Sequence, residues 1–320
     1  MHCPCCGAPP HGAGDVLAFQ DPISRDAAAV ADLTQQAREA GSEMGAILRS
    51  LRDRLKAQQR ASRLAERMVA EAYRSAVAAL EDLLGRVPGP IAERLARLNV
   101  NVSALEYLLD GAGISRAESE VGRVLLDTLD LQRRALEAAG LPVERSINAR
   151  ALQAALTDVR ERFWQGAIRG PSARLMLDGL RSSVSGETLS EAIARIGNRL
   201  ERSLSRAATE ARTTFAIFDR AIAAQAGAEA GAELYLYVGP RDGITRPFCG
   251  VLAGLVLDRA QVAALDNGQT AVAPLYAGGG YNCRHALSPV SAGLVERLGL
   301  PRATADDVVT ANARAWRPGR

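Results

Sequence analysis

The chain has 320 residues, of which 48% are hydrophobic and 4% aromatic, and it carries a net charge of +3. A core of small aliphatic side chains with few rings favours packed helices over a β-sandwich. The 39 basic and 36 acidic residues nearly balance, so charge gives no case for wrapping nucleic acid, which needs a clustered basic face. No apolar run approaches the roughly 18 residues of a membrane span, so we expect none.

Residues 1–20 are rich in Gly, Pro, Cys and His and show little periodicity, so we expect a flexible terminus. This segment lacks the apolar stretch of a signal peptide, and we expect synthesis in a reducing cytosol. The odd count of five cysteines argues against a disulfide framework. Cys3 and Cys6 form a C-x-x-C pair, the usual half of a zinc knuckle. Two interpretations stay open: a metal site at Cys3 and Cys6, or a frayed terminus with unligated thiols.

The segment 21–230 is predicted to be a helical domain. Leucines recur at spacings of three and four between residues 48 and 55, which is the periodicity of an amphipathic helix. We expect helix over 24–84, with a break near Gly41 and Gly45 and a stop at the following Pro-Gly-Pro. Further helices are expected at 91–98, 103–109, 116–139, 149–165 and 172–180, with Gly170-Pro171 separating the last two.

The most regular segment is 189–222, where apolar side chains step by three or four. This pattern predicts one long helix with a single apolar stripe. The opposite face carries charged residues, namely Glu191, Arg195, Arg199, Arg202, Arg206, Glu210 and Arg220. We interpret this face as solvated, because a soluble helix needs exposed charge. The alternative is an arginine-rich surface that docks on a partner.

The periodicity then changes, and we predict a small α+β module over 231–300, followed by a C-terminal helix and tail over 301–320. Leu234–Val238 is rich in β-forming residues and is predicted to be a strand. A second short strand is expected at 254–257 and a glycine-rich loop over 266–280. The predicted fold class is therefore mainly α, with long amphipathic helices followed by this module.

Several short helices near the C-terminus have side chains that suit their N-caps. Thr245 precedes a segment with proline in the first turn, where the missing N–H has no partner to lose. Asp258 and Ser291 are also expected to cap helices. Thr304 and Asp307 resemble a capping box in which Asp replaces the usual Glu.

Cys249, Cys283 and His285 are candidate ligands of a metal ion, with Asp242 as a possible fourth. Cys283 and His285 point to the same face if their segment is extended, and Cys249 ends a short helix that could approach them. Two thiolates, an imidazole and a carboxylate make a mixed site that suits zinc. The alternative is a pair of buried thiols, a histidine bound to a backbone carbonyl and an aspartate that holds its turn.

Arg246 and Arg284 are predicted to hold the loops of the module. We expect Arg246 to pair with Asp242, and Arg284 to donate hydrogen bonds to loop carbonyls. A small loop-rich domain has many carbonyls to satisfy, and the five donors of one guanidinium reach several at once.

A nucleophilic role is a further possibility for the thiols. Cys249 or Cys283 could form a thiol–imidazole pair with His285. Nothing supplies a third, orienting group at a recognisable spacing, and the phosphate-loop and hydrolase motifs are missing from the sequence. The residues alone therefore show no catalytic constellation.

Two separated runs in the C-terminal part of the chain match the motifs of one known family. An Asp-x-x-Thr-Arg-Pro-x-Cys run, a strand with glycine, a variable loop and an Asn-Cys-Arg-His run resemble the phage Mu F-like family of minor head (head morphogenesis) proteins of tailed phages. The matching residues are Asp242, Thr245, Arg246, Pro247, Cys249, Gly254, Asn282, Cys283, Arg284, His285 and Pro289. The helix segments 209–213 and 218–220 also resemble the lead into this domain. Many relatives have Trp at the position of Tyr237 and His near Phe248, so the chain resembles a cysteine-bearing subgroup.

The resemblance implies a virion component, not an enzyme. Proteins of this family are minor head proteins that associate with the portal and with other head or scaffold proteins. They assist head assembly and the packaging or ejection of DNA. We accordingly expect this chain in the virion, and in the bacterial host cytoplasm during assembly. Zinc is its possible cofactor because of the candidate ligands Cys249, Cys283 and His285.

Two alternatives remain open at this point. Some Mu F-like domains are fused to secreted or injected effectors of the ADP-ribosyltransferase type, which need an extra domain with its own strands and catalytic Glu. A DNA-binding assembly factor would need a continuous basic face on the helix within 187–225. Glu191, Glu201 and Glu210 interrupt that face, so we expect at most non-specific contact with DNA.

Overall fold

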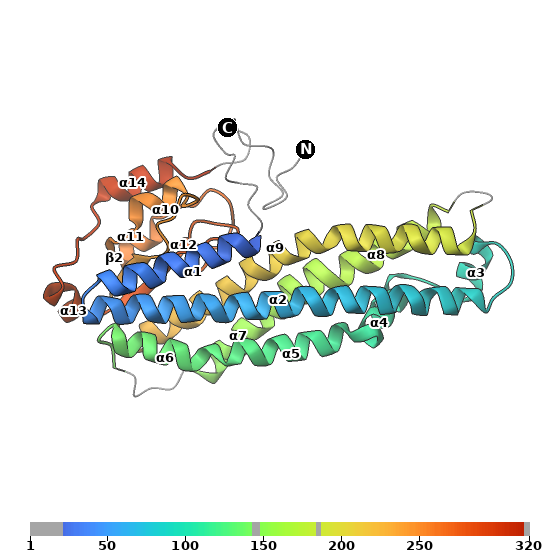
Figure 1. Cartoon of the computed structure of the whole chain (residues 1–320), viewed down its shortest axis with the longest axis horizontal. Coiled ribbons are helices and arrows are strands. Elements are labelled where there is room, and N and C mark those ends of the chain that lie inside the picture. Colours follow the sequence, from blue (N-terminus) through green and yellow to red (C-terminus); the bar gives the residue numbers. More distant parts are fainter. Residues whose placement is uncertain (1–21, 143–147, 184–186, 317–320) are drawn as a thin grey trace. The chain divides into compact units, whose positions relative to one another are not determined.

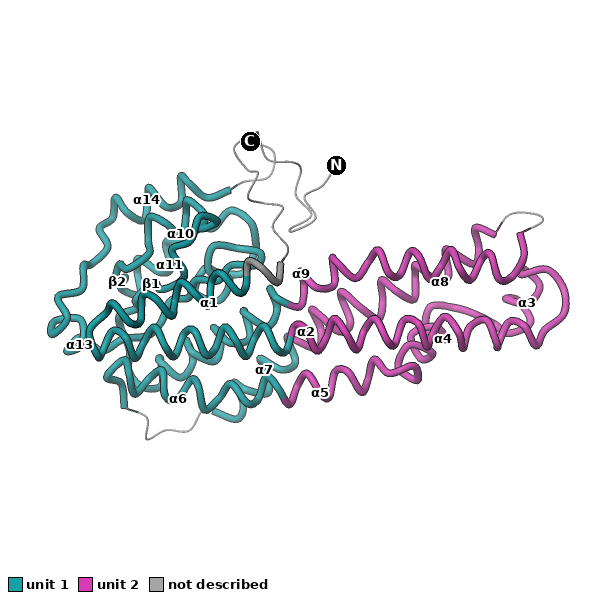
Figure 2. Tube along the Cα trace, viewed as in Figure 1, with its two compact units in different colours: residues 1–61, 124–158, 212–320 teal, residues 62–123, 159–211 magenta. Residues whose placement is uncertain are grey.

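The computed structural model describes residues 22–142, 148–183 and 187–316. The chain forms two compact units, each built from stretches that lie apart in the sequence (Figure 2). Unit 1 comprises the residues up to 61, then 124–158 and 212 onwards, and unit 2 comprises 62–123 and 159–211. Helical stretches from the first half of the chain therefore share a unit with the C-terminal module, and the units do not follow the predicted domain boundaries.

The structure confirms a mainly helical chain with a small sheet near its C-terminus (Figure 1). Among the described residues, none of the helices combines the length and the hydrophobicity that a membrane span requires. Unit 1 contains α1 (Pro22–Glu39), the first part of α2 (Ser42–Gly85), α6 (Thr128–Ala138), most of α7 (Ala149–Val159) and the last part of α9 (Leu189–Glu229). Its module adds β1 (Leu234–Val238), α10 (Pro247–Leu252), β2 (Val256–Asp258), α11 (Arg259–Ala263), α12 (Pro274–Ala277), β3 (Ala286–Val290), α13 (Ala292–Arg297) and α14 (Ala305–Ala313).

The strands of the module form one antiparallel sheet in the order β2-β1-β3. β1 pairs with β3 along its whole length, from Leu234 opposite Val290 to Val238 opposite Ala286. β1 has the predicted bounds. β3 is a strand that the sequence pattern does not predict, because Pro289 lies within it. Proline removes a donor from the ladder and is tolerated on an edge strand, which is the place of β3 in this order.

The sheet lies between two hydrophobic cores, and every residue of β1 is buried. Leu234, Leu236 and Val238 belong to a core that includes residues of α1, α2, α6 and α13. Tyr235 and Tyr237 belong to the other core, together with residues of α10, α11 and α14. This alternation follows the period of two in a strand. The first side of the sheet is aliphatic, whereas the second carries aromatic rings and thiols.

A buried ion pair joins the helices of unit 1. Arg54 of α2 donates to the Asp219 carboxylate of α9 at 2.6 Å, and both side chains are 2% exposed. Gln132 of α6 donates to the same carboxylate, and to the Asp219 carbonyl at 2.9 Å. A buried charge is costly unless it is paired. The packing of α2, α6 and α9 therefore places each charged group against its partner.

The described residues of unit 2 are mainly helical. It contains the rest of α2 and α9 together with α3 (Ile91–Arg97), α4 (Val102–Leu109), η2 (Asp110–Ile114), most of α5 (Ser115–Leu126), η3 (Arg160–Arg169) and α8 (Gly170–Arg181). η3 is a π-helix, whereas η2 is a kink at Gly113, whose φ is 126°. Its core encloses Phe163 and Trp164, whose ring centroids lie 4.7 Å apart in an edge-to-face contact. Arg169 pairs with Asp110 at 2.8 Å and with Glu118 at 2.7 Å, and so ties η3 to η2 and α5.

Some predicted boundaries of helices and loops differ from the structure. Gly170-Pro171 does not separate two helices, because Pro171 occupies the first turn of α8 directly after η3, where a missing N–H is tolerated. The predicted helix over 116–139 is divided into α5 and α6 at Asp127. The glycine-rich loop predicted over 266–280 contains the short helix α12.

Candidate metal centre

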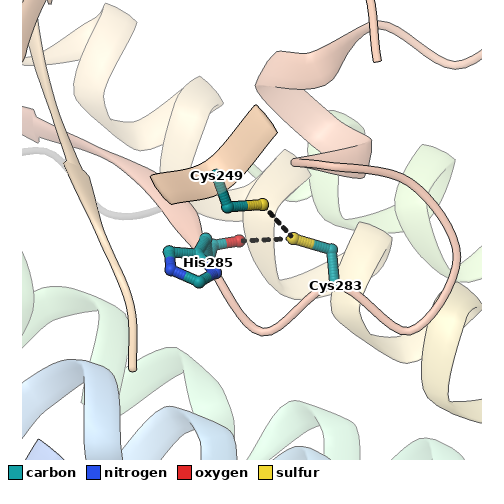
Figure 3. A group of neighbouring side chains, drawn as sticks. All are labelled: Cys249, Cys283 and His285. Carbon is teal, nitrogen blue, oxygen red and sulfur yellow. Dashed lines mark hydrogen bonds between the residues drawn. The ribbon is translucent and has the colours of Figure 1, made fainter. Parts of the chain in front are cut away.

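Three side chains with metal-binding chemistry meet in the module, on the side of the sheet that carries Tyr237 (Figure 3). Cys249 lies on α10, Cys283 in the turn after α12, and His285 directly before β3. Their ligand atoms all lie within 4.8 Å of one another. The structure thus brings together three of the four side chains that the sequence suggests as a C-terminal ligand set.

The two sulfurs already have the spacing of a zinc site. Cys249 Sγ and Cys283 Sγ lie 3.7 Å apart. A tetrahedral zinc ion with Zn–S bonds near 2.3 Å holds its sulfur ligands about 3.8 Å apart. Cys249 is 1%, Cys283 6% and His285 2% exposed, so an ion bound here would be enclosed by protein.

His285 offers the third ligand atom. Its Nε2 is buried and has no hydrogen-bond partner among the described residues. Buried imidazole nitrogens normally have a partner, and a metal ion would supply one. The ring stacks on Tyr237, with centroids 5.5 Å apart and an interplanar angle of 19°. This contact fixes the orientation of the ring beside the two thiols.

Groups around the site donate hydrogen bonds to both sulfurs. The Gly279 N–H donates to Cys283 Sγ at 3.0 Å, and the Tyr237 hydroxyl donates to Cys249 Sγ at 3.3 Å. Such donors orient metal ligands and tune their basicity. Gly279 also lies so close to Cys249 that an added Cβ would stand 2.4 Å from its sulfur, which leaves room only for glycine.

The two thiols differ in acidity. The hydrogen bond from Cys249, aided by the His285 ring and the Arg220 guanidinium, holds the pKa of Cys283 well below its ordinary value, against the effect of burial. The hydrogen bond with Cys283 and burial raise the pKa of Cys249 well above the ordinary thiol value. Burial likewise raises the pKa of Tyr237, so its hydroxyl stays a donor. Cys283 is therefore the more acidic thiol of the pair, and the deprotonated thiolate is the form that binds a metal.

Arg220 of α9 anchors the turn that carries Cys283 and His285. It is 5% exposed and donates to the His285 carbonyl at 3.0 Å, to the Tyr276 carbonyl at 3.1 Å and to the Cys283 carbonyl. A guanidinium can serve several acceptors at once because its donors form a rigid fork. The prediction that Arg220 belongs to a solvated face is wrong, because the module covers this end of α9.

The roles predicted for Arg246 and Arg284 are exchanged in the structure. Arg284 pairs with both carboxylate oxygens of Asp242, one of them at 2.8 Å. Arg246 donates to the Gly279 carbonyl at 3.0 Å and to the Tyr281 carbonyl. Side chains alternate along an extended segment, so Arg284 points away from the face that its two neighbours share.

Asp242 is engaged by Arg284 and does not join the ligand group, contrary to the prediction of a fourth ligand. Burial acts to raise the pKa of Asp242, but the hydrogen bond and charge of Arg284 outweigh it, and the pKa is lowered. Asp242 is therefore charged, and its ion pair with Arg284 holds the turn of Asp242 against the segment that carries Arg284. This matches the part of the prediction in which an aspartate holds the turn.

Thr245 and Asn282 shape two turns of the module. Thr245 Oγ1 donates to the Pro240 carbonyl at 2.9 Å, and the N-cap of α10 has no side-chain hydrogen bond, so the predicted capping role of Thr245 is wrong. Asn282 has a φ of 53°, a left-handed conformation that Asn tolerates better than most residues. Its N–H donates to Thr213 Oγ1 of α9 at 3.1 Å.

The arginines predicted on one face of α9 have different surroundings. Arg202 and Arg206 are exposed, but Arg195 pairs with Glu187 at 2.9 Å, and Arg220 is buried beneath the module. These arginines therefore do not form the continuous basic face that docking on DNA would need.

Cys3 and Cys6, the second candidate metal pair, lie outside the described residues. No family model, curated protein or solved structure matches the chain. The resemblance to Mu F-like proteins therefore rests on the residue pattern between 242 and 289 and on the helix segments that precede it.

Proposed function

We propose that the chain is a non-enzymatic minor head protein of a tailed phage or prophage. In this proposal it associates with the portal protein and with other head or scaffold proteins, and it assists head assembly and DNA packaging or ejection. It resides in the virion, and in the bacterial host cytoplasm during assembly. One observation carries the proposal: the two runs that resemble the family meet in space. Asp242 of the first run pairs with Arg284 of the second, and Cys249 lies against Cys283.

The burial of the cysteines and histidine supports a structural role over catalysis. A nucleophilic thiol and its base must touch a substrate. Cys249, Cys283 and His285 are each no more than 6% exposed, so a substrate would reach them only after the module opened. Their immediate neighbours are core residues, and Tyr237 covers the histidine ring.

Zinc is the cofactor of this proposal, bound by Cys249, Cys283 and His285. A structural zinc ion contributes directly to folding free energy. Here it would connect α10, the turn after α12 and the start of β3 at one point. The orphaned Nε2 of His285 and the sulfur spacing support this assignment. The Asp242 carboxylate holds its turn instead of binding the ion.

Co-purification tests the proposed function. The full chain, carrying an affinity tag, is expressed with the portal protein of the same genome, and the complex is isolated by affinity and size-exclusion steps. We expect the two proteins to elute together, and we expect the chain in purified virions by mass spectrometry. Separate elution, together with virions that lack the chain, would contradict the proposal.

The two alternatives give different results with the same protein. A DNA-binding assembly factor would shift duplex DNA at low salt and lose binding steeply as salt is raised. An effector of the ADP-ribosyltransferase type would transfer label from NAD to proteins of a lysate. We expect no such labelling, and its appearance would contradict the non-enzymatic assignment.

A further inference from the structure

The cysteines of the module form a close pair whether or not a metal is bound. Cys249 and Cys283 are the cysteines among the described residues, and both are free. Their sulfurs are 3.7 Å apart (Figure 3). A disulfide bond is about 2.05 Å long, so the sulfurs must approach by roughly 1.7 Å to bond. A side-chain rotation with a small shift of the turn can supply such a movement.

The glycines beside the pair place no side chain between the two sulfurs. Cys283 follows the run Gly278–Gly280, and Gly279 presents no side chain to Cys249. The turn is held to Arg220 and Arg246 through its carbonyl groups, and these bonds do not involve the sulfurs. The sulfurs can therefore move together while the turn keeps its anchors.

We propose that Cys249 and Cys283 form a reversible disulfide when no metal is bound. Either zinc or this covalent bond then links α10 to the turn that carries Cys283. Hydrogen peroxide is a sufficient oxidant. One thiol is oxidised to a sulfenic acid and releases a molecule of water. The sulfur of the other thiol then displaces the hydroxyl of the sulfenic acid, which leaves with the remaining thiol proton as a second water.

The disulfide links α10 to the turn after α12 without a metal. Zinc and the disulfide exclude each other, because the ion needs both sulfurs as thiolates. A bond between residues 249 and 283 restricts the unfolded chain and so stabilises the folded module. For a virion component, which is the proposed function, zinc would serve in the reducing host cytoplasm and the disulfide in the oxidising medium outside.

Peptide mapping tests the proposal on the full chain. The protein is stripped of metal with a chelator, exposed to hydrogen peroxide, alkylated, digested without reductant and examined by mass spectrometry. We expect a peptide that joins Cys249 to Cys283, that disappears on reduction, and that is absent when saturating zinc precedes the peroxide. A variant with Cys3, Cys5 and Cys6 replaced by Ser should give the same joined peptide.

The outcomes separate this inference from the metal assignment. Alkylation of both thiols after peroxide, or joining only to the N-terminal cysteines, would overturn the disulfide. A joined peptide in a chain that binds no zinc would support the disulfide and reject the metal. Zinc binding without any joined peptide would support the metal assignment and reject the disulfide. Cys249→Ser must abolish the joined peptide in every case.

Discussion

Asp219 and Arg220 are neighbours on α9, yet their buried charges are satisfied in opposite ways. Asp219 faces a full opposite charge, because Arg54 of α2 pairs with it and Gln132 adds a hydrogen bond. Arg220 instead donates hydrogen bonds to three carbonyl groups of the module, beside the Cys283 thiol. The first arrangement fixes α9 to the other helices of unit 1. The second fixes the turn of the candidate metal centre to α9.

The two sides of the sheet therefore differ in how their buried polar groups are satisfied. On the aliphatic side, packing dominates and the buried pair of Arg54 and Asp219 joins α2 to α9, so removing one charge leaves the other uncompensated. On the side of the metal centre, loops expose many backbone carbonyls, and arginines distribute their donors among them. Loss of one such arginine leaves neutral acceptors unpaired, which costs less than a stranded charge.

The largest effect is expected for Asp219→Ala. This change leaves the Arg54 guanidinium buried without a counter-charge, and breaking a buried pair in this way costs about 3–5 kcal/mol. Urea unfolding of the full chain, followed by circular dichroism, measures the loss. Asp53→Ala is a matched control, because Asp53 pairs with Arg52 at a more exposed position and should cost less than about 1 kcal/mol. Equal losses in the two variants would contradict the comparison.

Arg220→Ala should have the next largest effect. Loss of hydrogen bonds to three carbonyls, at about 1 kcal/mol each, lowers the free energy of unfolding by about 3 kcal/mol. Arg202→Ala, an exposed change on the same helix, should stay within about 0.5 kcal/mol. Arg220→Lys keeps the charge but loses the fork, and we expect an intermediate loss. If Arg220→Ala unfolds like the wild-type chain, the anchoring role is wrong.

Gly279→Ala tests how tightly the metal centre is packed. The new Cβ would stand 2.4 Å from Cys249 Sγ, and overpacking of this kind costs about 1–3 kcal/mol. It also displaces one candidate ligand, so zinc affinity, measured by chelator competition, should fall. Gly250→Ala is the control, since nothing lies within 4 Å of a Cβ added there. Unchanged zinc affinity in Gly279→Ala would contradict the site geometry.

The smallest effect at neutral pH is expected for Asp242→Asn, at about 1 kcal/mol for a half-buried pair. The pKa of Asp242 is lowered from its ordinary value of 3.8. Its contribution to stability is therefore complete above that ordinary value and is lost as the pH falls through the lowered one. The gap in urea midpoint between wild type and variant should shrink from pH 7 to pH 2. A gap that stays constant or widens in acid would contradict the pairing with Arg284.

Much of the fold was predictable because it depends on local pattern. The long helix that became α9, strand β1, and the caps at Asp258, Ser291 and Thr304 follow from neighbouring residues, and the structure confirms them. The break between α1 and α2 at Gly41 was predictable for the same reason, whereas Gly45, where a break was also expected, lies within α2.

The arginine contacts of the site were not predictable, because they depend on tertiary packing. The spacing of apolar residues along one helix does not show that the module, which lies elsewhere in the sequence, covers Arg220. One signal was present: Asp219 and Arg220 interrupt a stretch of α9 that is otherwise almost free of charge, which indicates burial on all sides. The exchange between Arg246 and Arg284 depends on how the turn after α12 approaches Asp242. Sequence spacing alone carries no information about that approach.

Metal content tests the central claim of a zinc-closed module most directly. Elemental analysis of the full chain, purified without chelator, is compared with that of the Cys283→Ser and Cys3→Ser variants. We predict zinc in equal molar amount to the wild-type chain, retained in Cys3→Ser and lost in Cys283→Ser. A wild-type chain without metal, or zinc lost only in Cys3→Ser, would contradict the assignment of Cys249, Cys283 and His285 as its ligands.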